Sequence, residues 1–492
     1  MPRMNATVRA LVLSVALLFA AAAPAAAREA VVQSFDGTEI HVTFHLAEGL
    51  KAHERAPTIL QTHGWGGSRE KNPDAATSEA TGNVGVGPLR KAGFNVLTWD
   101  SRGFGESGGT VTVDSKDFEG RDVQALLDWL ADQPEAKLDG PNDPRVGMHG
   151  VSYAGGIELV SAAIDDRIEA IAPSIAWHSL LTSLYKDDTI KGGWSSLLYA
   201  SGQATGRLDP HITSAFVSGT TTGKLSPEDK AWFESRGPGD ELVQRIRVPT
   251  LLLQGTADTL FTPSEAIRNY EILRNNRVPV KMMWFCGGHG TCLTGSGPAG
   301  HFEGRVIAWL RKYVAMRPST PVGPGFEWLA DDAVWRSSPS WPPPSGAPLV
   351  ANGSGTLALT PLDAVSGTPI AAGPAANAVN VPIPAATAQV VGEPQLRLTY
   401  SGTGVVGQVF AQIVDDKRNV VLGNLVTPLP VTLDGASHTV TRSLEGVAAS
   451  MTPAGTYHLQ VIGGSQVYGP VRGAAAITLS NARLELPTVG AP

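Results

Sequence analysis

Three side chains of this 492-residue chain have the types and positions that nucleophilic hydrolysis requires. Ser152 follows the apolar run in "RVGMHGVSYAGG", Asp258 ends "PTLLLQGTAD", and His289 follows the next apolar run in "MMWFCGGHGTC". A histidine that takes the proton of a serine hydroxyl makes that oxygen nucleophilic, and an aspartate orients the imidazole ring. The order serine, aspartate, histidine is that of an α/β-hydrolase triad. We therefore expect these three residues to act together at the carboxyl edge of one sheet.

The residues around Ser152 are small, as a sharp strand-to-helix turn requires. Positions −2 and +2 are Gly150 and Ala154, so the motif reads G-x-S-x-A rather than G-x-S-x-G. Alone the motif is weak, because short glycine and serine patterns also suit an ordinary turn. Its weight comes from Asp258 and His289, which follow in the required order.

A second glycine-rich stretch, "LQTHGWGGSRE", follows the first central apolar run and predicts an oxyanion hole. We expect the backbone amides of Trp65 and Tyr153 to bind the negative oxygen of a tetrahedral intermediate. Loss of one such donor typically raises the barrier by about 3 kcal/mol. His63 and His149 precede glycines at strand ends and are expected to be structural.

Both cysteines of the chain flank the histidine in "WFCGGHGTC". Cys286, His289 and Cys292 as a zinc site would supply three ligands and no clear fourth. A redox pair is disfavoured because the spacing is not C-x-x-C. In an oxidising compartment two nearby thiols tend to pair, so a Cys286–Cys292 disulfide that closes the His289 loop is favoured. We expect no metal and no cofactor.

The first 27 residues predict export. A basic start, the apolar run "LVLSVALLFAAAA" and a small-residue end form a secretory signal peptide, with cleavage after Ala27. The alternative is a membrane anchor, which is disfavoured because the run is short and Pro24 interrupts it. No later stretch is long and apolar enough to span a bilayer, so we expect a secreted protein. A net charge of −7 with 17% charged residues gives no basic stripe, which argues against a nucleic-acid partner.

Residues 28–317 alternate short apolar runs with amphipathic segments, which predicts a doubly wound α/β sheet. Residues 178–247 interrupt this rhythm with helix-like segments, and we interpret them as a helical cap inserted after one strand. A Trp/Pro-rich connection follows at 318–348. Residues 349–492 alternate apolar and polar positions between turn residues, which predicts a C-terminal all-β sandwich or jelly roll.

Several motifs resemble the X-Pro dipeptidyl-peptidase / cocaine esterase family of α/β-hydrolase serine hydrolases. "GVSYAGG" is similar to that family's nucleophile turn, "TWDSRGFGESGG" to its D-x-R-G-x-G-x-S-x-G loop, and "WLADDAVWRSSPSWPPP" to its crossing into a jelly roll. The resemblance covers nearly the whole mature chain. It implies the Ser152, Asp258, His289 triad, a helical cap and a β-sandwich beside the site. Family members commonly place a tyrosine hydroxyl in the oxyanion hole, where this chain has Trp65.

The leading hypothesis is a secreted serine hydrolase that cleaves an ester or amide bond of a small acyl or peptide substrate through an acyl-enzyme on Ser152. Within it, an X-Pro dipeptidyl-peptidase is placed first and a carboxylesterase or acylase of the cocaine esterase type second. The competing class is a non-catalytic carbohydrate- or polymer-binding protein. An aminopeptidase also needs a carboxylate for the substrate's ammonium group. Asp187 and Asp188 in "LYKDDT" are candidates, although acid pairs of this kind usually lie on a solvated face.

Overall fold

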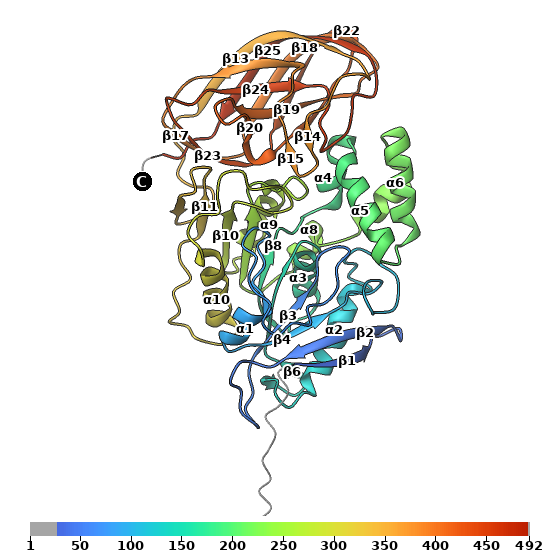
Figure 1. The fold of residues 1–492 in the computed structure, drawn as a ribbon, viewed down its shortest axis with the longest axis vertical. Helices are drawn as coiled ribbons and strands as arrows, with labels where there is room; N and C mark the ends of the chain where they lie inside the picture. The colour runs from blue at the N-terminus through green and yellow to red at the C-terminus, as the bar shows by residue number, and fades with distance from the viewer. Residues whose placement is uncertain (1–26, 491–492) are drawn as a thin grey trace, which may run out of the picture.

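The computed structural model describes residues 27–490 and consists of an α/β domain with an all-β domain at one end (Figure 1). The predicted leader lies outside the described residues, apart from Ala27, which begins the first strand. No helix within residues 27–490 is long and apolar enough to cross a membrane.

Ten strands of the described chain form the central sheet. Their order is β1-β2-β4-β3-β7-β8-β9-β10-β11-β12, and the strands from β4 to β11 run parallel to one another. Their bounds are β1 (Ala27–Gln33), β2 (Glu39–His45), β3 (Thr58–Thr62), β4 (Asn95–Trp99), β7 (Val146–Val151), β8 (Ile168–Ser174), β9 (Thr250–Gly255), β10 (Val280–Phe285), β11 (Phe326–Leu329) and β12 (Trp335–Ser338). A small hairpin, β5 (Leu138–Gly140) and β6 (Asp143–Pro144), lies outside this sheet.

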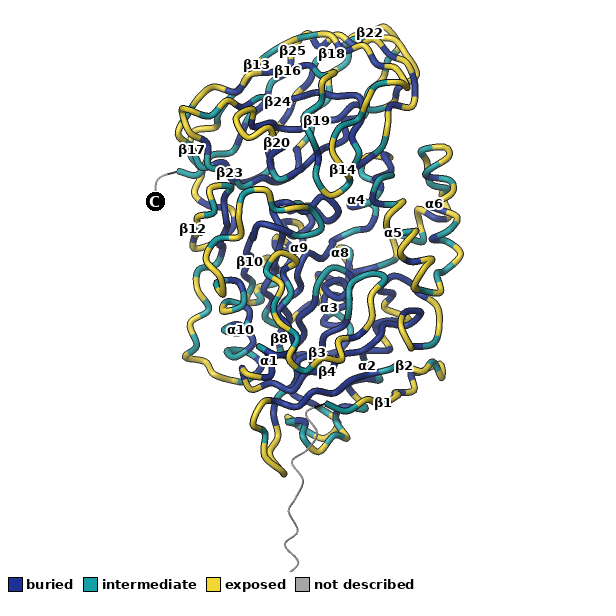
Figure 2. Tube along the Cα trace, in the orientation of Figure 1, coloured by how far each residue is buried: buried dark blue, intermediate teal, exposed yellow. Residues whose placement is uncertain are grey.

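Helices cover both faces of this sheet, which confirms the doubly wound α/β fold. One core cluster joins the central strands to α2 (Glu119–Ala131), α3 (Tyr153–Ile164) and α9 (Pro263–Asn275). A second cluster joins them to α1 (Val86–Lys91) and α10 (His301–Tyr313). Because both faces are covered, the inner parallel strands are buried along nearly their whole length (Figure 2).

The cap lies between β8 and β9. It contains α4 (Leu180–Leu184), the 3₁₀ turn η1 (Lys186–Asp188), α5 (Gly192–Thr205), α6 (Pro210–Thr222), α7 (Pro227–Glu234) and α8 (Gly239–Val243). The start of α6 is capped by the side chain of Asp209, and the start of α7 by that of Ser226, each with proline in the first helical turn. In Figure 1, α5 and α6 stand side by side at one edge of the α/β domain.

The C-terminal domain is a sandwich of antiparallel sheets, which confirms the all-β prediction. One sheet contains β13 (Leu349–Leu359), β25 (Ala475–Leu486), β18 (Gln395–Gly404) and β22 (Asp434–Ser443). The other contains β16 (Ala378–Ile383), β24 (Tyr457–Ile462), β19 (Gln408–Asp415), β20 (Val420–Val421) and β21 (Thr427–Pro430). Shorter elements are β14 (Gly367–Thr368), β15 (Ala371–Ala372), β17 (Ala388–Gly392), β23 (Val447–Met451) and η2 (Leu422–Asn424). Inward side chains alternate along the strands and meet in one core.

The Trp/Pro-rich connection is more regular than the sequence suggests, because it contains β11 and β12. β11 pairs in parallel with β10 and extends the central sheet. The reason is aromatic packing: Trp284 of β10 contacts Phe326 and Trp341, with ring centroids 5.3 and 4.8 Å away. Burial of these rings fixes the segment against the α/β domain.

Candidate active site

Ser152 occupies the turn between β7 and α3 in a strained backbone conformation. Its φ is 61° and its ψ is −117°, a region that residues with side chains rarely adopt. Its amide donates to the carbonyl of Ser174 at 2.8 Å and so ties the turn to β8. An added Cβ at Gly150 would lie 2.5 Å from the Cβ of Ala154. This crowding explains why small residues flank the serine.

The structure brings Ser152, His289 and Asp258 into one hydrogen-bonded row. Nε2 of His289 lies 2.7 Å from Oγ of Ser152, and Nδ1 lies 2.7 Å from Oδ2 of Asp258. The carboxylate of Asp258 is fully buried, and its Oδ1 accepts from the amides of Leu260 and Phe261 at 3.0 and 2.8 Å. Because Nδ1 donates to this carboxylate, Nε2 is left to accept the serine proton.

The loop that carries His289 is closed by a disulfide between Cys286 and Cys292, as expected from the sequence. Their Cα atoms are 5.3 Å apart, and the two sulfurs are bonded to each other rather than presented to a metal. Within residues 27–490 no group of three His, Cys, Asp or Glu side chains has the geometry to hold a metal ion. Gly288 has a φ of 104°, and an added Cβ there would lie 2.6 Å from Oδ2 of Asp258. The loop therefore requires glycine beside the aspartate.

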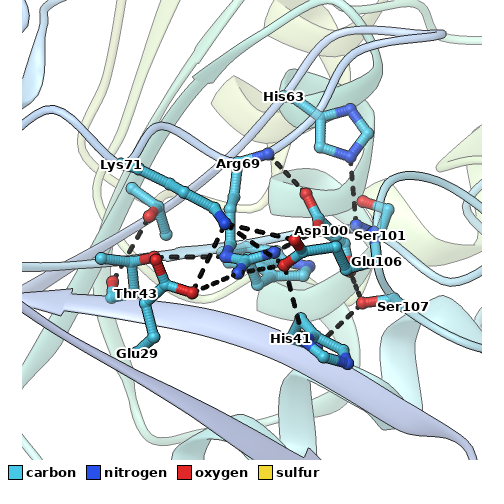
Figure 3. Close-up of polar contacts among 12 residues, drawn as sticks. Glu29, His41, Thr43, His63, Arg69, Lys71, Asp100, Ser101, Glu106 and Ser107 are labelled. Atoms are coloured by element: carbon cyan, nitrogen blue, oxygen red, sulfur yellow. Dashed lines mark hydrogen bonds and ion pairs between the residues drawn. The ribbon is translucent and has the colours of Figure 1, made fainter.

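The glycine-rich loop of residues 63–69 is anchored at both ends against the loop that begins at Asp100 (Figure 3). At one end, Nε2 of His63 accepts from the amide of Ser101 at 3.1 Å. At the other, the amide of Arg69 donates to Oδ1 of Asp100 at 2.6 Å, and its guanidinium pairs with Oδ2. Both side chains of this ion pair are 1% exposed. Removing one member of a buried pair is strongly destabilising, so the contact holds the loop in place.

Trp65 and Tyr153, the two residues expected to supply oxyanion amides, pack against each other beside Ser152. Their rings meet edge-to-face with centroids 5.6 Å apart, and Nε1 of Trp65 donates to the carbonyl of Leu198 in the cap. A Cβ built on Gly64 would lie 4.0 Å from the Cβ of Ser152, so this loop adjoins the nucleophile. The amide of Trp65 donates to no acceptor in the part of the chain that is described. Tyr153 opens α3, where the first amides have no acceptor within the helix.

The hydroxyl of Tyr153 does not point to solvent. It donates to Oε1 of Glu119 at 3.3 Å, and burial raises the pKa of the phenol well above its usual value. Burial also raises the pKa of Glu119, although Thr112 donates to the carboxylate from its amide and hydroxyl at 2.7 and 2.5 Å. The side chain of Tyr153 therefore forms a fixed wall beside Ser152.

His149 lies beneath the site as a neutral structural residue. Its Nδ1 donates to the carbonyl of Ala172 at 2.8 Å, and its Nε2 accepts from the amide of Val84 at 2.9 Å. Burial lowers the pKa of His149 to about 4, so the ring stays uncharged at neutral pH.

Lys191, at the start of the cap helix α5, supports the loop of Asp258 and was missed by sequence reasoning. Its Nζ donates to the carbonyls of Thr259 and Leu260 at 3.0 and 2.9 Å. Burial lowers the pKa of this lysine to about 8, while the charge of Glu445 acts in the opposite direction. No charge partner or motif in the sequence marks this lysine. These two hydrogen bonds connect the cap to the loop that follows Asp258.

The C-terminal sandwich reaches the same region. Oε1 and Oε2 of Glu445 accept from Nζ of Lys186 at 2.7 Å and from the hydroxyl of Thr262 at 2.6 Å. Burial by itself would raise the pKa of Glu445, but the positive charge of Lys186 holds it below its usual value. Near the disulfide loop, the side-chain amide of Asn424 donates to the carbonyl of Thr291 at 2.8 Å. The sandwich therefore braces both the cap and the His289 loop.

A hollow with about 860 Å³ of empty space, part of it open to solvent, adjoins Ser152. Trp65, Tyr153 and Phe261 form its wall on the hydrolase side, and the cap helices α4, α5 and α6 form the other walls. The ring of His289 is held at this end by edge-to-face contacts with Trp194 and Phe261, at centroid distances of 5.8 and 5.1 Å. A substrate in the hollow would place its reacting carbon beside the serine.

Asp187 and Asp188, the candidates for binding an ammonium group, do not line this hollow. Asp188 pairs with Lys230 at 2.9 Å on an exposed face of the cap, and Asp187 lies 3.5 Å from Arg442 of the sandwich. Nζ of Lys230 lowers the pKa of Asp188, which is the behaviour of a solvated ion pair. The structure therefore does not bring these two acids together with Ser152.

The fold, the turn at Ser152 and the row of three polar side chains define an α/β-hydrolase with a cap and a C-terminal sandwich. Residues 36–291, more than half of the chain, match the model of the X-Pro dipeptidyl-peptidase (S15 family). The chain belongs to this family of serine hydrolases, which confirms the family resemblance read from the sequence.

Curated relatives match only in part. An uncharacterized 31.7 kDa protein of Escherichia coli, from the traX-finO intergenic region, is 29% identical over 138 residues, which are 28% of this chain and 42% of the relative. An uncharacterized protein of Pseudomonas aeruginosa is 31% identical over 103 residues, 21% of this chain and 26% of the relative. The chain thus spans less than half of the length of these relatives.

Solved structures share the whole architecture at low sequence identity. An α-amino acid ester hydrolase has a TM-score of 0.70 at 14% identity, covering 94% of this chain and 96% of its own. An aminopeptidase of a Thaumarchaeota archaeon has a TM-score of 0.70 at 13% identity, with the same coverage. A CocE/NonD family hydrolase of Staphylococcus aureus has a TM-score of 0.68 at 14% identity, covering 95% and 97%. At this identity the likeness shows the fold alone.

Proposed function

We propose that this chain hydrolyses a carboxylic ester or amide through an acyl-enzyme on Ser152. The observation that carries the proposal is the row Ser152–His289–Asp258, with both inner distances at 2.7 Å. In acylation, Oγ of Ser152 attacks the carbonyl carbon while Nε2 of His289 takes its proton. The bond from that carbon to the leaving oxygen or nitrogen then breaks, and His289 returns the proton to the leaving group.

Deacylation repeats these steps with water. His289 takes a proton from the water, the hydroxide oxygen bonds to the acyl carbon, and the ester bond to Oγ of Ser152 breaks. The proton passes from His289 to Oγ, and a carboxylic acid is released. Asp258 remains ionised throughout, orients the ring and stabilises the imidazolium that forms in each half-reaction.

The amides of Trp65 and Tyr153 are proposed as the oxyanion donors. Two observations support this role: the Gly64–Trp65 segment adjoins Ser152, and the Trp65 amide has no acceptor within residues 27–490. Preorganised amides of this kind stabilise the negative oxygen more in the transition state than in the substrate. Trp65 replaces the tyrosine common in the family, so the backbone supplies this stabilisation.

The family makes a peptide that begins with X-Pro one candidate substrate, and a carboxylic ester is the other. The apolar hollow beside Ser152 favours the ester. We also propose, from the leader and the disulfide, that the protein acts outside the cytoplasm. A smaller hollow, with about 440 Å³ of empty space, is lined in part by Arg418 and Asn424 of the sandwich, and the larger hollow at Ser152 favours the hydrolase over the binding-protein alternative.

A fluorophosphonate probe tests the proposal, because it labels only an activated serine. We expect one label per chain, on the peptide that contains Ser152, and none on the Ser152→Ala variant. Parallel assays with Ala-Pro-p-nitroanilide and p-nitrophenyl butyrate then identify the bond. Absence of labelling together with absence of turnover of both substrates would refute the hydrolase.

A further inference from the structure

The hollow beside Ser152 has almost no polar surface of its own. Among the described residues, no acidic, basic or amide side chain lines it. The lining is otherwise aliphatic and aromatic, with leucines, isoleucines, phenylalanines and tryptophans from the cap and from the hydrolase loops. A charged group placed here would lose its hydration and find no ion partner, which is strongly unfavourable.

The few polar groups in the lining are mostly engaged elsewhere. The hydroxyl of Ser195 donates to the carbonyl of Lys191 at 3.1 Å, and that of Tyr153 donates to Glu119. The hydroxyl of Tyr185 accepts from the amide of Leu225 at 3.3 Å. These groups therefore do not form an anchor for a substrate's ammonium or carboxylate.

Three of the charged groups near the hollow, Asp258, Lys191 and Glu119, are committed to other contacts. Asp114 lies outside the lining, and burial raises the pKa of its carboxyl well above its usual value, which favours the uncharged acid. Each oxygen of Asp258 accepts two hydrogen bonds, from Leu260 and Phe261 at one oxygen and from His289 at the other. The ammonium of Lys191 faces two backbone carbonyls. Glu119 lies behind Tyr153 and outside the lining.

We infer, on the basis of the acyl-enzyme proposed above, that the acyl group that this site accepts is uncharged and apolar. The carbon chain of the acyl group then lies between α4, α5 and α6. The substrate class is then a neutral ester or amide of an aliphatic or aromatic carboxylic acid. A substrate with a free α-ammonium group, such as an unblocked amino-acid ester or dipeptide, is excluded from this site by the same chemistry.

A pair of isosteric substrates tests whether the site rejects a charged acyl group. Methyl isobutyrate and alanine methyl ester differ in that a methyl group replaces the ammonium, and at about pH 6.5 most of the amine is protonated. We expect kcat/KM at least 100-fold higher for methyl isobutyrate. For p-nitrophenyl esters from acetate to hexanoate, kcat/KM should rise roughly fourfold per added methylene. Equal or better turnover of alanine methyl ester or Ala-Pro-p-nitroanilide would overturn the inference.

Matched substitutions on α6 test whether the acyl group lies in the hollow. Ala215 is 5% exposed and lines the hollow, whereas Val217 on the same helix is 51% exposed and does not. Ala215→Phe should lower the ratio of hexanoate to acetate kcat/KM at least tenfold, and Val217→Phe should leave that ratio within twofold. An unchanged ratio in Ala215→Phe would show that the acyl chain lies elsewhere.

A second variant tests the same assignment in case Ala215→Phe does not fold. Phe216 also lines the hollow and stacks on Tyr199 at a centroid distance of 4.0 Å. Phe216→Ala enlarges the space, so the best acyl chain should become longer; an unchanged optimum would overturn the assignment. The fluorophosphonate probe distinguishes failure of this inference from failure of the proposed hydrolase function. If only the inference is wrong, Ser152 is still labelled; if the proposed hydrolase function is wrong, Ser152 is not labelled.

Discussion

The carboxyl edge of the central sheet and the cap above it hold their side chains in different ways. At the sheet edge, Ser152, Asp258 and His289 follow buried strands and meet through short polar contacts. In the cap, helices α4, α5 and α6 present apolar side chains to a hollow and make few polar contacts with it. In the function proposed above, the sheet edge carries out the chemistry, and the cap selects the acyl group that reaches Ser152.

The largest effect is expected from removing the nucleophile. Ser152→Ala should lower kcat by about 10⁴-fold or more, because the attacking oxygen is lost and only binding and the oxyanion amides remain. The rate of p-nitrophenyl butyrate hydrolysis measures this, and an unchanged melting temperature shows that the fold is intact. A decrease below tenfold would mean that the sheet edge does not carry the chemistry.

The next effect is expected at the aspartate. Asp258→Asn keeps the shape of the side chain but favours the wrong tautomer of His289, so kcat should fall by about 10³- to 10⁴-fold. The pH profile of kcat/KM checks the cause: the variant should regain part of its activity at high pH. If Asp258→Asn retained most of the activity, another carboxylate would have to orient the ring.

The contact between the two regions runs through Lys191. Lys191→Met leaves the carbonyls of Thr259 and Leu260 unpartnered, so we expect a loss of about 2 kcal/mol in the free energy of unfolding and roughly tenfold lower kcat/KM. Lys230→Met on the exposed cap face is the matched control, with little expected change. Equal effects of the two variants would show that Lys191 does not position the Asp258 loop.

Lys191 also predicts a pH dependence of stability. Burial lowers its pKa from 10.5 to about 8, so between these values the unfolded chain holds a proton that the folded chain has released. Stability from this group therefore rises with pH across that window. Urea unfolding should show the wild type gaining stability relative to Lys191→Met as the pH rises from about 8 to 10; a constant difference would contradict this pKa.

The disulfide should matter less than these groups. The double variant Cys286→Ser, Cys292→Ser should fold, lose about 2 kcal/mol of stability and turn over several-fold more slowly, because the glycine-rich loop around His289 gains freedom. Thermal unfolding and kcat measure the two effects. Unchanged values of both would show that contacts such as Asn424 to Thr291 hold the loop without the bridge.

The smallest effect is expected at the two cap acids. Asp187→Asn and Asp188→Asn should change kcat/KM less than twofold and stability by about 0.5 kcal/mol, because both side chains lie outside the hollow and Asp188 forms an exposed ion pair. A tenfold loss toward a substrate with a free amino group would restore them as binding residues.

Much of the fold could be predicted because local patterns determine it. Continuous apolar runs predict the buried parallel strands, and small residues around Ser152 predict the strained turn. The pairing of Cys286 with Cys292 follows from their closeness in the chain and the leader. Each of these signals lies within a few residues of the feature that it predicts.

Other parts depend on contacts between residues far apart in the chain. Lys191 is an ordinary lysine in the sequence, and only the fold places its ammonium on the loop after Asp258. The strands β11 and β12 extend the sheet because Phe326 and Trp341 pack on Trp284. The cap hollow is likewise built from separate helices, so its apolar lining cannot be read from any one of them.

The most direct test of the central claim is to trap the covalent intermediate. The protein is mixed with p-nitrophenyl butyrate, and the reaction is quenched with acid during turnover. The protein is then digested, and the masses of its peptides are measured by mass spectrometry. We predict one butyryl group per chain, on the peptide that contains Ser152, and none on the Ser152→Ala variant. Continued turnover with no acyl group on Ser152, or an acyl group on a different residue, would contradict the account.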